Sequence, residues 1–84
     1  MVIFLTVGAA IRSRIFELCK ERNISINKLS TISGVTQSTV NNIISGRNNT
    51  TTVSTIKKLC DGLDITIKDF FASDLFDELE QEIK

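Results

Sequence analysis

The chain has 84 residues, of which 42% are hydrophobic and 24% charged, and it contains no Pro, Trp, Tyr or His. This balance is typical of one small compact domain and excludes a disordered chain. Histidine is the usual general base and the commonest metal ligand, and the two cysteines, Cys19 and Cys60, are too few for a zinc site. We therefore expect no enzyme, with no catalytic residues, no metal and no cofactor.

The formal net charge is zero, but the charges are unevenly divided along the chain. Residues 1–60 contain eight basic and two acidic residues, a net charge of +6. Residues 61–84 contain two basic and eight acidic residues, a net charge of −6. Such asymmetry indicates a region that binds a polyanion, joined to a segment that stays clear of it, although ordinary surface charge is the alternative interpretation.

The cysteines and the apolar N-terminal segment bear on where the protein works. Cys19 and Cys60 lie within apolar helical patterns, where a free cysteine behaves as a small hydrophobe, and they indicate a reducing, cytoplasmic location. Residues 1–11 are largely apolar, but no basic segment precedes them and they are too short to span a bilayer. We expect neither a signal peptide nor a membrane partner.

The first predicted helix begins after Thr6, which can cap it, and ends at Asn23. The apolar spacing predicts a buried side made of Ile11, Ile15, Leu18 and Cys19. The solvent side is expected to carry Arg12, Arg14, Glu17, Lys20 and Glu21. Residues 2–5, which precede the helix, are either an edge strand or a frayed end.

Two short helices follow, separated by a glycine turn. Ser25 is expected to cap the second helix, which stops at Gly34 because glycine readily adopts the left-handed conformation of helix ends. Thr36 is expected to cap a third helix that ends at Gly46. Its inward side carries Val40, Ile43 and Ile44.

The rest of the chain continues the helical pattern. Thr52 is expected to cap a fourth helix that closes at Asp64, and Thr66 to start a fifth. After Ser73 or Asp74 the apolar spacing predicts a short C-terminal amphipathic helix. The chain is therefore predicted to be all-α, with a body over residues 1–72 and an acidic amphipathic helix over residues 73–84.

The third predicted helix has an unusual solvent side, made of amides and hydroxyls with neither Glu nor Lys. These residues are mediocre helix formers, so helix stability does not explain their choice. Amides that both donate and accept match the edge of adenine, and the first half of a helix fits a major groove. The sequence thus predicts base contacts, with a merely polar surface helix as the alternative, from Gln37, Ser38, Asn41 and Asn42.

The stretch SINKLSTISGVTQSTVNNIISGR, residues 25–47, resembles the helix-turn-helix of the lambda-repressor-like, Cro and Xre family. The stretch TVSTIKKLCDGLDITIKDFF, residues 52–71, resembles the fourth and fifth helices of the same family, so residues 7–71 are covered. The resemblance implies a compact five-helix DNA-binding domain with the helix-turn-helix at helices two and three.

Position by position, the resemblance implies which residues meet DNA. Residues that match Gln37, Ser38 and Asn42 face base edges in the family, and Asn41 is added to them. Residues that match Ser45, Arg47 and Asn48 lie along the phosphates or the groove rim in the family. We add Ser25, Lys28, Thr36 and Thr39 to these expected contacts with the DNA backbone. The N-termini of the helices at Thr36 and Thr52 can add N–H donors to phosphates.

The sequence departs from the family at two places. A glutamine that grips a phosphate in many members is replaced by Ile26, and Ser25 and Lys28 are the nearest substitutes. An Arg–Glu pair of many members is replaced by Cys19 and Ile44, which we expect to touch, because packed hydrophobic residues can replace a buried ion pair.

Together these features predict a sequence-specific regulator of transcription, a repressor, that reads the major groove of double-stranded DNA with residues 36–45. One such domain reads few base pairs, so we expect a homodimer on a near-palindromic operator. The dimer contact is expected along the last helix, unless that helix folds back on its own domain, through Phe71, Leu75, Phe76, Leu79 and Ile83. The alternative is an antitoxin-like or regulatory interaction module that holds a protein partner at this tail.

Overall fold

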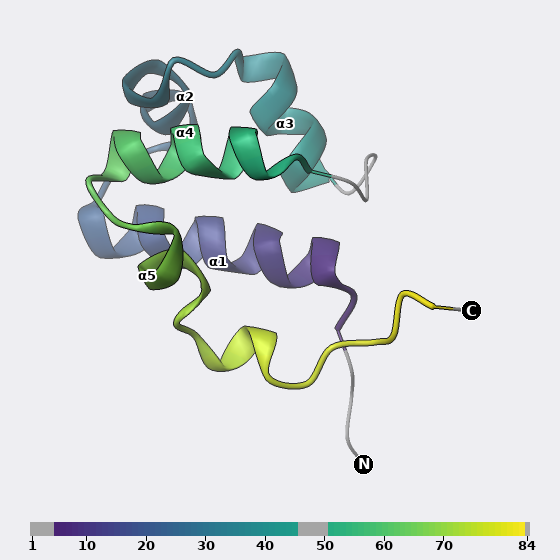
Figure 1. The fold of residues 1–84 in the computed structure, drawn as a ribbon. Helices are drawn as coiled ribbons and strands as arrows, with labels where there is room; N and C mark the ends of the chain where they lie inside the picture. The colour runs from purple at the N-terminus through teal and green to yellow at the C-terminus, as the bar shows by residue number, and fades with distance from the viewer. Residues whose placement is uncertain (1–4, 46–50, 84) are drawn as a thin grey trace.

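The computed structural model describes residues 5–45 and 51–83 and consists of five α-helices followed by one short 3-10 helix (Figure 1). Their bounds are α1 Val7–Arg22, α2 Ile26–Ser33, α3 Gln37–Ser45, α4 Val53–Leu63, α5 Ile67–Phe71 and η1 Asp74–Phe76. The predicted five-helix order is confirmed. In these described ranges no helix is both long and apolar enough to cross a membrane.

Hydroxyl side chains fix where each α-helix begins. Each accepts a hydrogen bond from the backbone N–H three residues further on, which satisfies one donor that the first helical turn leaves unpaired. These residues are Thr6, Ser25, Thr36, Thr52 and Thr66. At α5 the cap is reciprocal, because the carboxylate of Asp69 accepts from the N–H of Thr66.

Three helices end at a residue in the left-handed conformation, namely Asn23, Gly34 and Asp64. At Gly34, with φ of 67°, the backbone N–H returns to the carbonyls of Ser30 and Thr31 at the end of α2. Glycine adopts this conformation without the steric cost that a Cβ atom brings.

The core is one apolar cluster to which all five α-helices contribute. In Figure 1, α4 runs between the α2–α3 pair and α1, and α5 closes the lower side. Fully buried side chains come from each helix: Ile15, Leu29, Val40, Leu59, Cys60 and Phe70. α2 and α4 approach closely at Gly62, where an added Cβ atom would lie 2.3 Å from Ser33 Oγ.

Both cysteines are free thiols within this core, and Cys19 is 4% exposed. Burial raises the pKa of both thiols, with a smaller opposing effect of Arg22 at Cys19. Ile44 packs against the same cluster, so apolar residues occupy both positions where the ion pair was expected to be replaced. The predicted burial of Cys19 is confirmed, and its direct contact with Ile44 stays a prediction.

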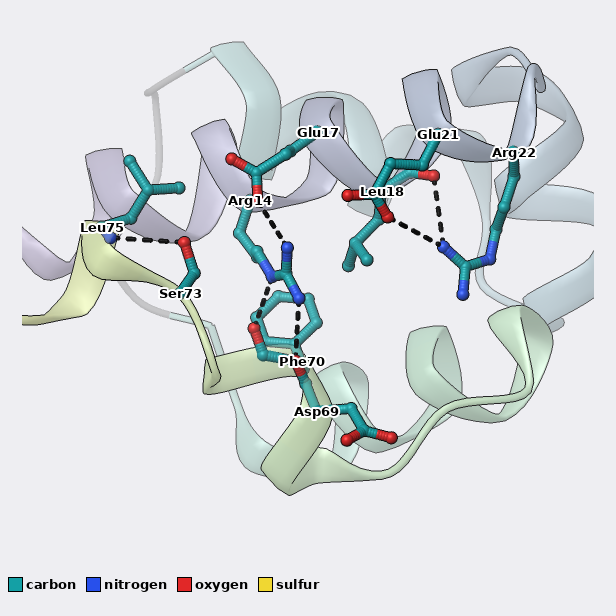
Figure 2. A network of polar contacts seen from close by, with 9 residues as sticks. All are labelled: Arg14, Glu17, Leu18, Glu21, Arg22, Asp69, Phe70, Ser73 and Leu75. Carbon is teal, nitrogen blue, oxygen red and sulfur yellow. Dashed lines mark hydrogen bonds and ion pairs between the residues drawn. The ribbon is translucent and has the colours of Figure 1, made fainter.

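Arg14 was expected on the solvent side of α1, and that expectation is wrong. Its guanidinium lies between α1 and α5, where Nε donates to the carbonyl of Phe70 at 2.7 Å and Nη2 to that of Asp69 at 2.8 Å (Figure 2). Nη1 pairs with the carboxylate of Glu17. A helix leaves its last carbonyls without partners, so α5 gains two charged donors from this contact.

The predicted C-terminal amphipathic helix does not form. Residues 74–76 make the single turn η1, which packs against α1, and the chain then extends so that Leu79 forms a parallel bridge with Leu5. The N–H of Glu80 donates to the carbonyl of Leu5 at 2.8 Å. Leu5 is therefore paired, and residues 2–4 of the proposed edge strand lie outside the described residues.

Charge explains why the helical spacing of the tail was misleading. A helix over residues 73–83 would place like charges one turn apart, at Asp74 with Glu78 and at Glu78 with Glu82. Acidic residues near its C-terminus would also oppose the helix dipole, and helices this short are marginal in any case. The segment instead folds back as a turn that packs Phe76 against the core.

Candidate nucleic-acid interface

The turn between α2 and α3 is fixed by contacts on both sides of Gly34. The Ser30 hydroxyl donates to the carbonyl of Val35, and the N–H of Val35 donates to the carbonyl of Ser30 at 3.2 Å. Val35 is itself buried, so its side chain closes the turn against the core. The angle between the two helices is thereby held by residues that lie next to one another in the sequence.

α3 is anchored on one side and open on the other. Val40 and Ile43 are buried and Ile44 packs against the core, whereas the opposite side is exposed along the whole helix. That exposed side carries the four side chains predicted to meet bases: Gln37, Ser38, Asn41 and Asn42. The structure therefore brings these four together on one surface.

The hydroxyls predicted to contact the DNA backbone already have partners within the fold. Ser25 Oγ accepts from the N–H of Lys28 at 3.0 Å, and Ser45 Oγ donates to the carbonyl of Asn42 at 3.3 Å. A hydroxyl that accepts at a helix cap keeps its own O–H as a donor. Ser25 can thus cap α2 and still donate to a phosphate oxygen.

Thr36 and Thr39 form a pair that the sequence analysis missed. Their hydroxyl oxygens lie 2.9 Å apart, and Thr36 also accepts from the N–H of Thr39 at 3.2 Å. One hydroxyl of the pair donates its hydrogen bond to the oxygen of the other, so one O–H of the pair remains available to donate to a ligand. Thr52 and Thr55 repeat the arrangement at the start of α4, with oxygens 2.9 Å apart. The Thr-x-x-Thr spacing in the sequence could have predicted both hydroxyl pairs.

The basic residues differ in how accessible their charge is. Lys28 and Lys58 are exposed cations, with no ion pair in the described part of the chain. Lys57 is tied to Asp61 one turn away, and this hydrogen bond raises the pKa of the lysine. Arg14 is withdrawn into the fold. Two further predicted contacts, Arg47 and Asn48, lie outside the described residues.

The residues expected to form a dimer stripe do not share a helix face. Phe71 is 37% exposed and Ile83 is 89% exposed, whereas Leu75, Phe76 and Leu79 are half-buried. The rings of Phe71 and Phe76 pack edge to face with centroids 4.8 Å apart. The predicted stripe is therefore wrong in its geometry, since part of it covers the domain's own core.

The acidic segment lies far from α3. Figure 1 places residues 74–83 on the side of α1 away from α2 and α3. Negative charge at that end does not compete with an anion that approaches α3. The acidic residues of the tail are thus separated in space from α3, whereas Asp61 lies in α4 and pairs with Lys57. Among the described residues no cluster of three or more potential metal ligands occurs.

Comparison with known proteins found a family model and a solved structure that match the chain. The family model described as the Cro/C1-type HTH DNA-binding domain matches residues 14–73, which include α2 to α5 in full. Among solved structures, the chain is similar to the crystal structure of the prophage Lp1 protein 11, with 36% sequence identity and a TM-score of 0.79. That match covers 90% of this chain and 100% of the other. No curated protein matches the chain.

Proposed function

Because the chain belongs to the Cro/C1-type helix-turn-helix DNA-binding domain family, we propose that it is a sequence-specific regulator of transcription that acts as a repressor on double-stranded DNA. The observation that carries this proposal is α3, which is anchored by buried aliphatic side chains and exposes a continuous set of amides and hydroxyls. Such groups can hydrogen-bond to base edges in the major groove.

In this proposal one set of side chains contacts bases and another set contacts phosphates. Gln37, Ser38, Asn41 and Asn42 read base edges, because their amides and hydroxyl can donate and accept. Contacts to phosphates set the position of the domain and supply affinity without sequence preference. The residues assigned to that role are Ser25, Lys28, Thr36, Thr39, Ser45, Arg47 and Asn48.

A single domain of this size reads few base pairs, so the proposal includes a homodimer on a near-palindromic operator with half-sites about 34 Å apart. It also places the protein in the cytoplasm, where a DNA target and two reduced thiols are compatible.

The test is selection of bound duplexes from a random library at about 150 mM salt, where nonspecific attraction is weak and base readout persists. We expect enrichment of a near-palindromic motif. Gln37→Ala should change the preferred base at defined positions, at about 1–3 kcal/mol per contact. Asn27→Ala, which removes an exposed amide from α2, is the matched control and should leave the preferred bases unchanged.

Failure to enrich any sequence with folded protein would contradict the proposal. That outcome would favour an interaction module whose DNA binding is secondary, and a search for a protein partner would follow. Repression itself is tested by placing the selected operator across a promoter that drives a reporter gene. Reporter output that rises when the protein is present would contradict the repressor assignment.

A further inference from the structure

We propose that the acidic C-terminal segment of one copy, residues 77–83, docks on the exposed face of α1 of a second copy. The receiving surface is defined by Arg12, Phe16 and Lys20 and is called the α1 stripe below. This contact names a surface for the self-association included in the proposed function, but it forms without DNA and can be tested separately.

The α1 stripe is an exposed aromatic residue flanked by two cations. Arg12, Phe16 and Lys20 follow one another at intervals of four residues, so they lie in a row along one side of the helix. Phe16 is 47% exposed, and both cations are exposed. Within the described residues neither cation takes part in an ion pair. The stripe therefore offers charge and apolar area whose cations have no ion-pair partner among residues 5–45 and 51–83.

The C-terminal segment has the complementary chemistry. Glu78, Glu80 and Glu82 are exposed, and none belongs to an ion pair among the described residues. Ile83 is 89% exposed, the largest exposed fraction among the large apolar side chains that are described. Asp77 adds a fourth carboxylate, so the segment has four carboxylates and an exposed isoleucine, and it matches a surface with two cations and a half-exposed phenylalanine.

The two surfaces also match in length. Arg12 and Lys20 are eight residues apart, which is about 12 Å along a helix axis. Glu78 and Glu82 are four residues apart, which is about 13 Å in extended chain. The outer carboxylates of the segment can therefore face the two cations at the same time.

In the observed fold, the described residues of the segment form no ion pair with the stripe of their own chain. Successive helical residues are rotated by about 100°, so Arg14 points about 200° away from both Arg12 and Phe16. Arg14 faces α5, and η1 packs against α1 just before the segment begins. The Leu5–Leu79 bridge holds the segment ahead of the N-terminal end of α1. Complementary surfaces that are not paired within one chain can meet between two copies.

The test uses charge reversal on each surface, with sedimentation of the whole chain in low salt and without DNA. The stripe variant is Arg12→Glu/Lys20→Glu, and the tail variant is Glu78→Lys/Glu82→Lys. We expect the wild type to self-associate more weakly as salt rises, because exposed charge pairs are screened. Each variant alone should associate at least about tenfold more weakly, because like charges then face each other. An equimolar mixture of the two variants should recover association, because each reversed surface then finds an opposite charge.

Controls separate the contact from net charge and from folding. Lys58→Glu/Lys68→Glu gives the same net charge as the stripe variant and should leave association unchanged. Phe16→Ser should weaken association without altering any charge. Circular dichroism establishes that each variant is folded, and Arg12→Gln/Lys20→Gln replaces the stripe variant if the reversal unfolds α1.

Three results would overturn the inference. They are a wild type that stays monomeric at about 0.5 mM in low salt, a mixture that associates no better than its components, and a control variant that loses association as fully as the stripe variant. A protein that selects an operator but fails these tests keeps the proposed function and loses this contact. A protein that passes these tests but selects no operator keeps this contact and loses the proposed function.

Discussion

Arg14 in α1 holds the carbonyl of Phe70 in α5 through its Nε at 2.7 Å, across 56 positions of sequence. The same guanidinium reaches the carbonyl of Asp69 and the carboxylate of Glu17 (Figure 2). Because this side chain is nearly buried, its charge is balanced inside the fold rather than by water. The first and fifth helices are thus joined by one side chain.

Arg14→Met should destabilise the fold by about 2–4 kcal/mol, because two carbonyls at the end of α5 lose charged donors while the methionine keeps most of the packing volume. Arg14→Lys should recover part of this loss, since an ammonium lacks the planar fork that serves both carbonyls. Urea unfolding monitored by circular dichroism measures the difference. Arg12→Met, at an exposed position of the same helix, should stay within about 0.5 kcal/mol of the wild type.

Gly62→Ala should be destabilising, although alanine normally favours a helix by about 1 kcal/mol. The new Cβ would lie 2.3 Å from Ser33 Oγ and 2.9 Å from Ser33 Cα, so α4 must move away from α2. We expect a loss of about 1–3 kcal/mol in thermal or urea unfolding. Adding Ser33→Gly should recover part of it, and a stability equal to or above the wild type in Gly62→Ala alone would contradict the close approach.

Ser33→Ala should stabilise the protein. Among the described residues, Ser33 Oγ is a buried polar atom without a hydrogen-bond partner. A buried unsatisfied hydroxyl costs about 1–3 kcal/mol, and alanine is also the better helix former. We expect a gain of about 1 kcal/mol in the free energy of unfolding. Ser54→Ala, at an exposed position of α4, serves as the comparison for helix propensity alone.

Stability should fall as the pH rises above about 9. Burial raises the pKa of Cys19 and Cys60 above the ordinary thiol value of 9.0, so the unfolded chain releases these protons before the folded chain does. The folded state then binds more protons than the unfolded state, and its stability declines with pH. Below the ordinary thiol pKa this contribution is fully present. Urea midpoints measured at pH 7, 9 and 10 check the decline.

The double variant Cys19→Ala/Cys60→Ala should show a flatter pH dependence, whatever its absolute stability. Lys57 acts in the same direction at higher pH, because its hydrogen bond to Asp61 raises its pKa above 10.5. Asp61 also raises the pKa of Cys60, so Asp61→Asn is made in the cysteine double variant, where it removes the Lys57 contribution alone. An unchanged slope in the cysteine variant would mean that the thiols are not the source.

Phe76→Ala should cost about 1–3 kcal/mol in the free energy of unfolding, because this ring packs on the core and against Phe71. Ile83→Ala should change stability by less than about 0.5 kcal/mol, since its side chain is almost fully exposed. Equal effects of the two substitutions would contradict the observed course of the tail.

The elements that the sequence predicted well are those decided by neighbouring residues. Thr6, Ser25, Thr52 and Thr66 cap helices because a hydroxyl meets an N–H three residues ahead, and Gly34 ends α2 through its own backbone. Five helices, the helix-turn-helix and the exposed side of α3 follow from such local rules. The family match confirms the DNA-binding domain that the resemblance implied.

The features that the sequence left out depend on contacts between distant residues. No helical pattern shows that Arg14 will meet carbonyls 55 and 56 positions later, so its place beside solvent-facing residues was the natural expectation. In the tail, apolar spacing at every fourth residue suggested a helix, but the repulsion among its carboxylates and the pairing of Leu79 with Leu5 outweigh that spacing.

The bridge between Leu5 and Leu79 has a practical consequence for labelled forms of the protein. It brings the beginning and the end of the described chain to one place, on the side of α1 away from α3 (Figure 1). Labels attached at residues 5 and 79 therefore start from neighbouring points on the surface. A pair of labels at these two positions would report loss of the bridge as an increase in the distance between them.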